Sequence, residues 1–227
     1  MINIAIDGFA GSGKGTVSEG LAKHFNLKHL DTGAIFRSMA VAFSEINIFE
    51  PTEIDIQNYI DKIDIKIEFD GNNQIMFVSG KDVTSKLRAS DIALLSSKVS
   101  SFPLARKKYE DIAREFAKNY DCVIDGRDIT TVLLPNADVK IYLQADLNVR
   151  AGRRFKEYQT KNVDTTLDSV TENIKARDYN DANKGEYSTR ITKDAIVIDN
   201  TNLSIDETNE LVIKLVTERL GKLGKLK

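Results

Sequence analysis

A glycine-rich stretch, Gly8-Phe9-Ala10-Gly11-Ser12-Gly13-Lys14-Gly15-Thr16, constrains this 227-residue chain more than any other segment. It follows a short apolar run at residues 2–7 and precedes an amphipathic run that begins at Val17. A strand, a glycine-rich turn and a helix in this order are the context of a phosphate-binding loop, and the spacing of Gly8, Gly13 and Lys14 fits the loop pattern. The hydroxyl expected directly after the lysine comes one residue later, at Thr16.

The residue types in this stretch suit the binding of phosphate oxygens. Glycines let backbone N–H groups approach an anion without an intervening Cβ atom. The following helix adds its positive N-terminal end, and Lys14 adds a full charge. A glycine-rich corner with no ligand would not need the lysine in register. The sequence therefore predicts a nucleoside triphosphate site formed by Gly8, Phe9, Ala10, Gly11, Ser12, Gly13, Lys14, Gly15 and Thr16.

The charge balance excludes some functions. The chain has 34 acidic and 32 basic residues and a formal charge of −2, which argues against general binding of nucleic acid or of a membrane surface. Its single cysteine, Cys122, excludes an intrachain disulfide and is expected to be a buried structural thiol. The sequence contains no run of eighteen apolar residues and no signal-like leader, so we expect a cytoplasmic protein.

Strand-like and helix-like segments alternate along most of the chain, which predicts an α/β fold with a parallel sheet covered on both faces. The expected strands are residues 2–7, 27–30, 121–125, 139–143 and 195–199. The expected helices are residues 14–25, 34–47, 104–120, 146–160 and 165–182, with a last one opened by the capping box Ser204 to Glu207.

Residues 63–79 have a different pattern. Apolar and polar residues alternate on both sides of Asp70-Gly71, which predicts a β-hairpin in a small inserted lobe. After a break at residues 47–52 and this hairpin, helical spacing is expected to return from Ser85 to Ser100.

Other charged residues at motif edges indicate what the nucleotide is used for. Asp125 ends an apolar strand, and such an acid holds Mg²⁺ directly or through water in phosphate-loop proteins. Arg37, Arg127 and Arg177 also lie at motif edges. Convergent guanidinium groups would clamp a second phosphate group, as transfer to a phosphorylated acceptor requires. A nucleoside monophosphate is largely dianionic at neutral pH, so it can attack without a general base.

Several of these motifs occur together in one known family. The quoted loop, Leu30-Asp31-Thr32-Gly33-Ala34-Ile35-Phe36-Arg37, Phe102-Pro103 with Arg106, Asp125-Gly126-Arg127-Asp128, Leu134-Pro135-Asn136-Ala137-Asp138 and Arg177-Asp178 with Asp181 stand in the family's order. The chain resembles the bacterial cytidylate kinases over nearly its whole length. The resemblance implies transfer of the γ-phosphate of Mg²⁺-bound ATP to CMP or dCMP. We expect a monomer, because the sequence leaves no long exposed apolar stripe unused.

The same resemblance implies the architecture. It is a three-layer phosphate-loop kinase fold whose parallel sheet is flanked by helices, with a small monophosphate-binding lobe that contains β structure, and a short basic lid. The core would comprise about residues 1–33, 100–148 and 185–227. The lobe would comprise about residues 34–99, with the β insertion at about 60–90, and the lid about residues 149–184.

The resemblance also assigns roles to residues. Thr32, Gly33 and Arg37 would line the monophosphate site, and Ser97, Arg106 and Asp128 would read the base. A carboxylate can accept from the N4 amine of cytosine, whereas uracil presents a carbonyl there. Arg177 and Asp181 would contact the phosphate and the sugar. The catalytic group would be Lys14, Arg127, Arg153 and Arg154, and the metal group Thr16 and Asp125.

Two departures and two alternatives accompany this interpretation. Lys184 stands where the family usually has arginine, and it keeps the charge but loses the bidentate fork. Phe9 stands where proline is frequent in the family.

One alternative function is another small-molecule kinase, acting on UMP, AMP or an alcohol such as shikimate, for which Asp128 would serve as base. The other is a GTP-binding switch, against which the incomplete motif Asn183-Lys184-Gly185-Glu186 argues.

Overall fold

The computed structural model describes residues 1–226. The chain forms two compact units. Unit 1 comprises Met1–Lys28 and Tyr120–Lys227, and unit 2 comprises His29–Asn119. The finer division into core, monophosphate-binding lobe and lid stays a prediction.

Unit 1 contains the phosphate loop and most of the parallel sheet. Its elements are β1 (Asn3–Asp7), α1 (Lys14–Phe25), β6 (Cys122–Gly126), the π-helix η3 (Ile129–Leu133), β7 (Val139–Gln144), α6 (Leu147–Thr160), α7 (Leu167–Ala182), η4 (Gly185–Tyr187), β8 (Ile196–Asp199) and α8 (Ile205–Lys222). The expected strands and helices of this unit are confirmed to within about two residues at either end, the usual uncertainty of such boundaries.

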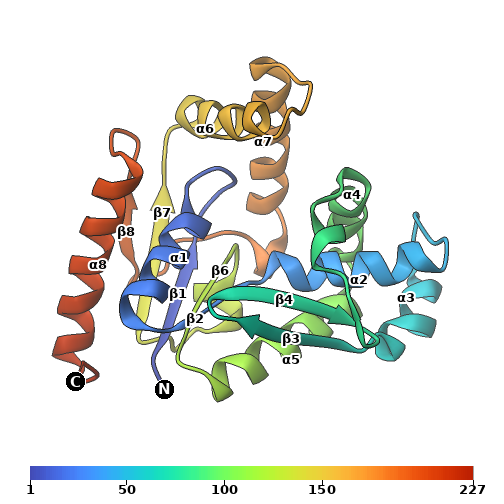
Figure 1. The fold of residues 1–227 in the computed structure, drawn as a ribbon, viewed down its shortest axis with the longest axis horizontal. Helices are drawn as coiled ribbons and strands as arrows, with labels where there is room; N and C mark the ends of the chain where they lie inside the picture. Colours follow the sequence, from blue (N-terminus) through green and yellow to red (C-terminus); the bar gives the residue numbers. More distant parts are fainter. Residues whose placement is uncertain (227) are drawn as a thin grey trace. The chain divides into compact units, whose positions relative to one another are not determined.

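The main sheet has the strand order β2-β6-β1-β7-β8, where β2 is Lys28–Asp31 (Figure 1). β1 pairs in parallel with both β6 and β7, and β7 pairs in parallel with β8. Parallel strands all end at one edge, so the segments that follow β1, β6, β7 and β8 lie along that edge. These segments include the phosphate loop and the stretch from Asp125 to Asp128.

Helices α1 and α8 pack together and cover one face of the sheet in unit 1 (Figure 1). Val17 and Leu21 of α1 meet Val212 and Val216 of α8 in one buried cluster. The sheet contributes Ile4, Ile6, Val123, Val139, Ile141, Leu143 and Ile198 to this cluster. The helix α8 begins at the expected capping box, in which Ser204 and Glu207 exchange hydrogen bonds of 2.8 and 3.2 Å.

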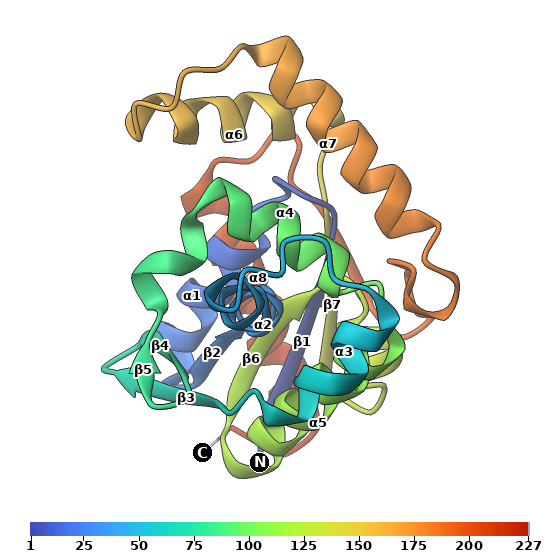
Figure 2. The same ribbon diagram turned by 90° about the vertical axis from the view of Figure 1, so that its right-hand side faces the viewer.

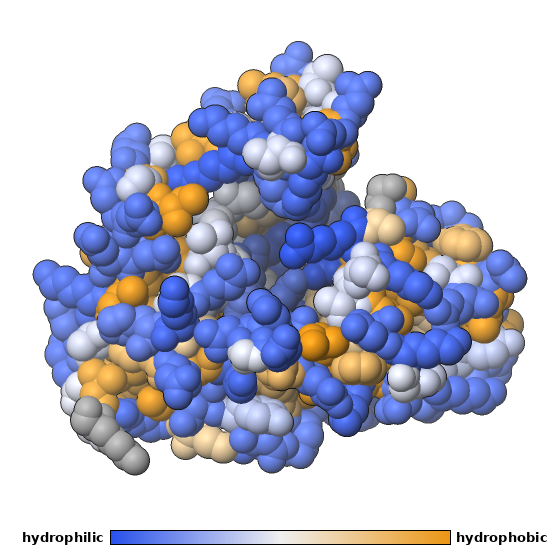
Figure 3. Space-filling view, viewed as in Figure 1, coloured by the Kyte–Doolittle hydropathy of each residue, from blue (hydrophilic) through white to orange (hydrophobic). Residues whose placement is uncertain are grey.

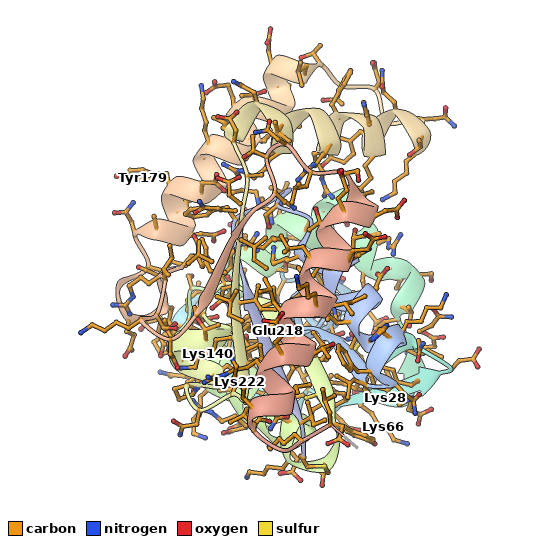
Figure 4. All side chains as sticks on the ribbon, turned by 90° about the vertical axis from the view of Figure 1, so that its left-hand side faces the viewer. Lys28, Lys66, Lys140, Tyr179, Glu218 and Lys222 are labelled. Carbon is orange, nitrogen blue, oxygen red and sulfur yellow. The ribbon has the colours of Figure 1, made fainter. Side chains whose placement is uncertain are left out.

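The opposite side of β7 carries a buried charge. Lys140, labelled in Figure 4, alternates with the core residue Ile141 and is 8% exposed. Its ammonium group lies 2.8 Å from Asp194, and this hydrogen bond holds the pKa of the Asp194 carboxyl below its ordinary value. We assign this pair a structural role because a buried lysine needs a partner.

Helices α6 and α7 form a hairpin beyond the sheet edge (Figure 2). Ala151 of α6 packs against Val170 and Ile174 of α7, with Leu147, Phe155 and Tyr158 around them. The surface of this hairpin, at the top of Figure 3, is mainly hydrophilic. Tyr179 is 70% exposed and projects from α7 in Figure 4. The two helices therefore share a small apolar core of their own.

Unit 2 combines helices with a small antiparallel sheet. Its elements are α2 (Gly33–Glu45), α3 (Glu53–Tyr59), η1 (Ile60–Lys62), β3 (Ile65–Asp70), β4 (Asn73–Val78), β5 (Lys81–Asp82), η2 (Thr84–Arg88), α4 (Ser90–Val99) and α5 (Pro103–Asn119). The predicted hairpin is confirmed: Asp70 pairs with Asn73, and Gly71 adopts the positive φ of +59° that the turn requires.

The expectation of one helix from Ser85 to Ser100 is wrong. The 3₁₀ helix η2 ends at Arg88, Ala89 is extended, and α4 then begins. At the start of η2, Thr84 Oγ1 accepts from Met76 N at 2.9 Å, which ties this short helix to the hairpin. Helix α3, which begins at a capping box between Thr52 and Asp55, was not predicted either. The strand β5 was also not predicted, because it has only two residues.

Candidate active site

The glycines of the phosphate loop are required by close packing in unit 1. A Cβ atom at Gly8 would lie 2.2 Å from the Leu143 carbonyl oxygen, and one at Gly11 would lie 2.9 Å from the Arg150 carbonyl oxygen. Gly13 has a left-handed φ of +92° and directly precedes α1, and its carbonyl oxygen accepts from Val17 N of that helix at 3.0 Å. The loop conformation therefore depends on residues that lack a side chain.

Three side chains from distant segments hold the loop carbonyls. Arg127 donates to Gly8 O, Arg150 to Ala10 O and Asn200 to Ser12 O, and the donor–acceptor distance is 3.0 Å in each case. In a trans peptide the N–H group points opposite to the carbonyl. The N–H groups of Phe9, Gly11 and Gly13 are consequently turned away from these three donors, which makes them available to an anion.

Lys14 and Thr16 lie on the first turn of α1. The Lys14 ammonium group lies 3.5 Å from the Phe9 carbonyl oxygen, folded back over the loop. Thr16 is exposed. The first turn of a helix favours negative charge, so both polar side chains stand where phosphate groups would be stabilised.

A charged cluster joins β6 to α7. Arg127 Nε donates to Asp181 Oδ2 over 2.6 Å, and Lys184 Nζ lies 3.4 Å from Asp181 Oδ1. Burial acts against the Asp181 carboxylate, but Arg127, Lys184 and Arg177 outweigh it and hold the pKa of Asp181 below its ordinary value. Burial, followed by the nearby charge of Arg127, lowers the pKa of Arg177.

The cluster thus brings together four of the predicted site residues: Arg127, Arg177, Asp181 and Lys184. Arg37 belongs to unit 2, and its convergence with Arg127 and Arg177 stays a prediction.

Arg153 and Arg154 of α6 have different surroundings. Arg153 donates to Asn200 Oδ1 at 3.2 Å, to Asn200 O at 2.8 Å and to Leu203 O at 3.2 Å. It therefore joins α6 to the segment after β8. Arg154 donates to Glu157 over 2.6 Å, and its guanidinium carbon lies 4.9 Å from the centre of the Tyr158 ring. Arg153 and Arg154 follow Arg150, which contacts the loop, by about one turn of the same helix.

Two acidic candidates lie in and just after the neighbouring strand β6. Asp125 is buried and pairs with Ile6 of β1 in the sheet register. Asp128 is buried and directly precedes η3. The carboxylate of Asp7, at the end of β1, bonds to Ile129 and Thr130. Both candidates therefore lie at the edge of the sheet that carries the phosphate loop.

A cavity of about 730 Å³ adjoins the loop within unit 1. It is lined by Phe9, Tyr142, Gln144, Ala145, Asp146, Arg150, Asp199, Thr201, Asn202 and Leu203. Such a volume is typical of small-molecule sites. The guanidinium carbon of Arg150 lies 5.8 Å from the centre of the Phe9 ring, so the wall nearest the loop is both cationic and aromatic.

The predicted residues of unit 2 lie on three helices. Asp31 accepts from Gly33 N at 2.9 Å and from Arg37 at 2.5 Å, which fixes the start of α2. Thr32 is buried next to them. Arg106 of α5 is buried, and its guanidinium carbon lies 5.8 Å from the centre of the Phe36 ring. Ser97 is exposed on α4. Asp31 therefore anchors Arg37, and Phe36 faces Arg106.

Four residues that support the site were not predicted from the sequence. Arg150 and Asn200 donate to loop carbonyls, Asp178 accepts from Arg150, and Asp7 holds the start of η3. Arg150 donates to Asp178 over 2.6 Å as well as to Ala10 O. A signal existed for Asn200, because it directly follows the last strand and so lies at the functional edge of the sheet. Asp7, the last residue of β1, carried the same signal.

The amino-acid sequence matches known proteins over nearly its whole length. The family model described as "Cytidylate kinase" matches residues 4–218. The chain belongs to the cytidylate kinase family. A cytidylate kinase of Caldicellulosiruptor saccharolyticus is 39% identical over 220 residues, which cover 97% of each chain. A cytidylate kinase of Thermosipho melanesiensis is 40% identical over 216 residues, 95% of this chain and 97% of the relative.

A solved structure agrees with the cytidylate kinase family at the level of the fold. The crystal structure of an uncharacterized protein from Eubacterium ventriosum covers 96% of this chain and 99% of its own, with a TM-score of 0.54 and 14% identity. The α/β fold with a parallel sheet flanked by helices is thereby confirmed for this member of the cytidylate kinase family. Among residues 1–226, no helix is both long and apolar enough to cross a membrane.

Proposed function

We propose that this chain transfers the γ-phosphate of Mg²⁺-bound ATP to CMP or dCMP, giving ADP and the cytidine diphosphate. The observation that carries the proposal is the shared sheet edge in unit 1. There the phosphate loop, anchored by Arg127 at Gly8 O, lies beside the cluster of Arg127, Arg177 and Asp181. Membership of the cytidylate kinase family supports the choice of acceptor.

The donor nucleotide would bind against the loop. The N–H groups of residues Gly8 to Thr16 and the Lys14 ammonium group would hold its β- and γ-phosphates. The cavity of about 730 Å³ beside Phe9 and Arg150 has room for its base. Arg153 and Arg154, on α6, would close over the triphosphate and exclude water.

Hard oxygen donors are present for Mg²⁺. The carboxylate of Asp125 and the hydroxyl of Thr16 would hold the ion, directly or through water. Among residues 1–226, no three His, Cys, Asp or Glu side chains gather in a metal-binding group. This fits Mg²⁺, which uses one or two protein ligands together with phosphates and water. When bound, the ion neutralises charge on the β- and γ-phosphates.

The acceptor contacts are proposed from the family resemblance. Arg37, Arg127 and Arg177 would grip its phosphate with Thr32 and Gly33 beside it. Lys184 would assist, and Asp181 would contact the sugar. Asp128 would accept from the cytosine amine, with Ser97 and Arg106 as the other base contacts. The carbonyl of uracil at the same position would face a carboxylate and be repelled.

The reaction then requires positioning and charge stabilisation. An oxygen of the CMP phosphate forms the new bond to the γ-phosphorus, and the bond to the β–γ bridging oxygen breaks, so ADP leaves with the electron pair. Lys14, Arg127, Arg153 and Arg154 offset the charge that builds up on the transferred group. No general base is needed, because the attacking phosphate is already ionised at neutral pH.

A coupled assay with CMP, dCMP, UMP, AMP and shikimate tests the proposal. We expect the highest kcat/KM with the cytidine nucleotides, and Lys14→Ala should reduce turnover about 100-fold or more with every acceptor. Lys23→Ala, at an exposed lysine of the same helix, is the matched control. Best turnover with another acceptor would favour the other small-molecule kinases. Equal binding of GTP and ATP without transfer would favour a switch.

We also propose that the chain acts as a cytoplasmic monomer on free nucleotides. The acidic excess of two charges supports the absence of nucleic acid and membrane partners. Size-exclusion chromatography with light scattering tests the oligomeric state. A mass near 25 kDa is expected, and a mass near twice that value would contradict it.

A further inference from the structure

Asp7 is a buried carboxylate at the point where β1 enters the phosphate loop. It is fully buried, and it accepts three hydrogen bonds from the start of η3. Oδ1 accepts from Ile129 N over 2.9 Å. Oδ2 accepts from Thr130 N over 2.8 Å and from Thr130 Oγ1 over 2.7 Å. One side chain therefore fixes two consecutive residues of a neighbouring segment.

These donors directly follow Asp128. The Ile129 N–H group and the Asp128 carbonyl belong to the same planar peptide. The N–H group of this peptide donates to Asp7. Its carbonyl oxygen accepts from Val132 N at 2.9 Å and from Leu133 N at 3.1 Å. The peptide plane that leaves the Asp128 Cα atom is thus fixed at both ends, at backbone angles for Asp128 of φ −130° and ψ 25°.

The other neighbour of Asp128 is anchored to the residue after Asp7. Arg127 donates to the Gly8 carbonyl oxygen over 3.0 Å. Consecutive residues at the start of the phosphate loop therefore hold the residues on both sides of Asp128. Because Asp128 is itself buried, its carboxylate can change direction little unless these anchors change.

The carboxylate of Asp7 carries an energetic cost. Asparagine or serine side chains commonly accept from backbone amides, and burying a carboxylate near a second one is costly. Burial and the neighbouring charge of Asp128 indeed raise the pKa of Asp7, although the bonds from Thr130 and Ile129 oppose this. A carboxylate can accept all three bonds at once, whereas an asparagine would turn an N–H₂ group toward one donor.

We propose that Asp7 and Thr130 are positioning residues that set the discrimination between cytosine and uracil acceptors by fixing Asp128. The inference rests on the proposed function, in which Asp128 contacts the base. A contact group must be held within about 0.5 Å of its productive place, so loss of an anchor should weaken recognition of the cytosine amine. Binding of ATP should change much less, since the three loop-carbonyl donors remain.

The test compares kcat/KM for CMP with kcat/KM for UMP in purified variants. Asp7→Asn keeps the size of the side chain but should lower the CMP/UMP ratio about tenfold, with little change in KM for ATP. Thr130→Val removes only the hydroxyl and should lower the ratio about three- to tenfold. Thr130→Ser restores the hydroxyl and should restore the ratio.

Thr208→Val is the matched control for general loss of a buried hydroxyl. Thr208 is buried on α8, and its Oγ1 donates to Ser204 O over 2.7 Å, so this variant should keep the wild-type ratio. If Asp7→Asn does not fold, Thr130→Val with its serine counterpart carries the test. Asp128→Ala is measured in parallel, and adding Asp7→Asn to it should lower the ratio no further.

The outcomes distinguish the positioning role of Asp7 and Thr130 from the base-reading role of Asp128. If Asp128→Ala lowers the ratio but folded Asp7→Asn and Thr130→Val keep it, the positioning inference is overturned and the proposed function stands. If Asp128→Ala leaves the ratio unchanged, the base-reading role of Asp128 is wrong and the inference falls with it. A fall of the ratio in Thr208→Val as large as that in Thr130→Val would also overturn the inference.

Discussion

Arg127 Nε lies 2.6 Å from Asp181 Oδ2, and the same arginine donates through its Nη1 atom to the Gly8 carbonyl oxygen over 3.0 Å. One guanidinium group thus links α7 to the first residue of the phosphate loop. Its planar arrangement of donors allows both bonds at once, which a lysine could not provide with the same geometry. The position of α7 and the conformation of the loop are therefore coupled through Arg127.

Replacement of Asp181 should weaken this coupling. In Asp181→Asn, Arg127 and Arg177 lose the carboxylate that offsets their repulsion, so we expect a fall in the free energy of unfolding of about 1–3 kcal/mol and a higher KM for CMP. Urea unfolding and steady-state kinetics measure the two effects. Glu172→Gln, on the exposed side of the same helix, should change neither. Unchanged stability in Asp181→Asn would contradict the prediction.

The stabilisation by Asp181 should also depend on pH. Its pKa is lower in the folded protein than the ordinary value of 3.8, so the carboxylate stabilises the fold fully above that value. The stabilisation is lost as the pH falls through the folded pKa. The difference in unfolding free energy between wild type and Asp181→Asn should therefore be constant at neutral pH and shrink below pH 3.8. A difference that grows with acidity would contradict this assignment.

Gly8 should tolerate no side chain. In Gly8→Ala the new Cβ atom would lie 2.2 Å from the Leu143 carbonyl oxygen, so the loop must move, and we expect loss of ATP binding together with lower stability. Isothermal titration with ATP and thermal unfolding measure these changes. Gly152→Ala is the control, because nothing lies within 4 Å of its added Cβ atom and the residue is helical. Wild-type ATP affinity in Gly8→Ala would show that the loop adapts.

Lys184→Arg should strengthen the acceptor site. Lys184 approaches Asp181 to 3.4 Å with a single ammonium group, whereas a guanidinium group can bind an anion through two parallel bonds. We expect KM for CMP to fall about two- to tenfold with kcat little changed. Steady-state kinetics at saturating ATP measure this, with Lys193→Arg as the control for the substitution itself. An unchanged or higher KM would contradict the role of Lys184 at the acceptor.

Cys122 should be unreactive in the folded protein. It is fully buried on β6, and burial raises the pKa of its thiol to about 12. Since the thiolate is the reactive form, iodoacetamide at pH 8 should leave the native chain unmodified and add one label after unfolding in urea. Mass spectrometry counts the labels. Rapid labelling of the native chain would contradict the burial of this thiol.

The sequence by itself determined the local structure and the family. Gly13, Lys14 and the flanking apolar runs predicted the strand, loop and helix, and the Asp70-Gly71 pair predicted the hairpin, because both depend on short-range backbone chemistry. The division at Ala89 could not be predicted, because η2 and α4 both have helical spacing and only the extended backbone of Ala89 separates them.

Only the tertiary structure decided which side chains hold the loop carbonyls and which side chain holds the start of η3. Arg150 and Asn200 lie 140 and 188 residues from the carbonyls that they contact, and Asp7 lies 122 residues from Ile129. No periodicity or motif marks such pairs. Parallel strand pairing places the ends of distant segments at one sheet edge, and the need to satisfy buried polar groups then selects these partners.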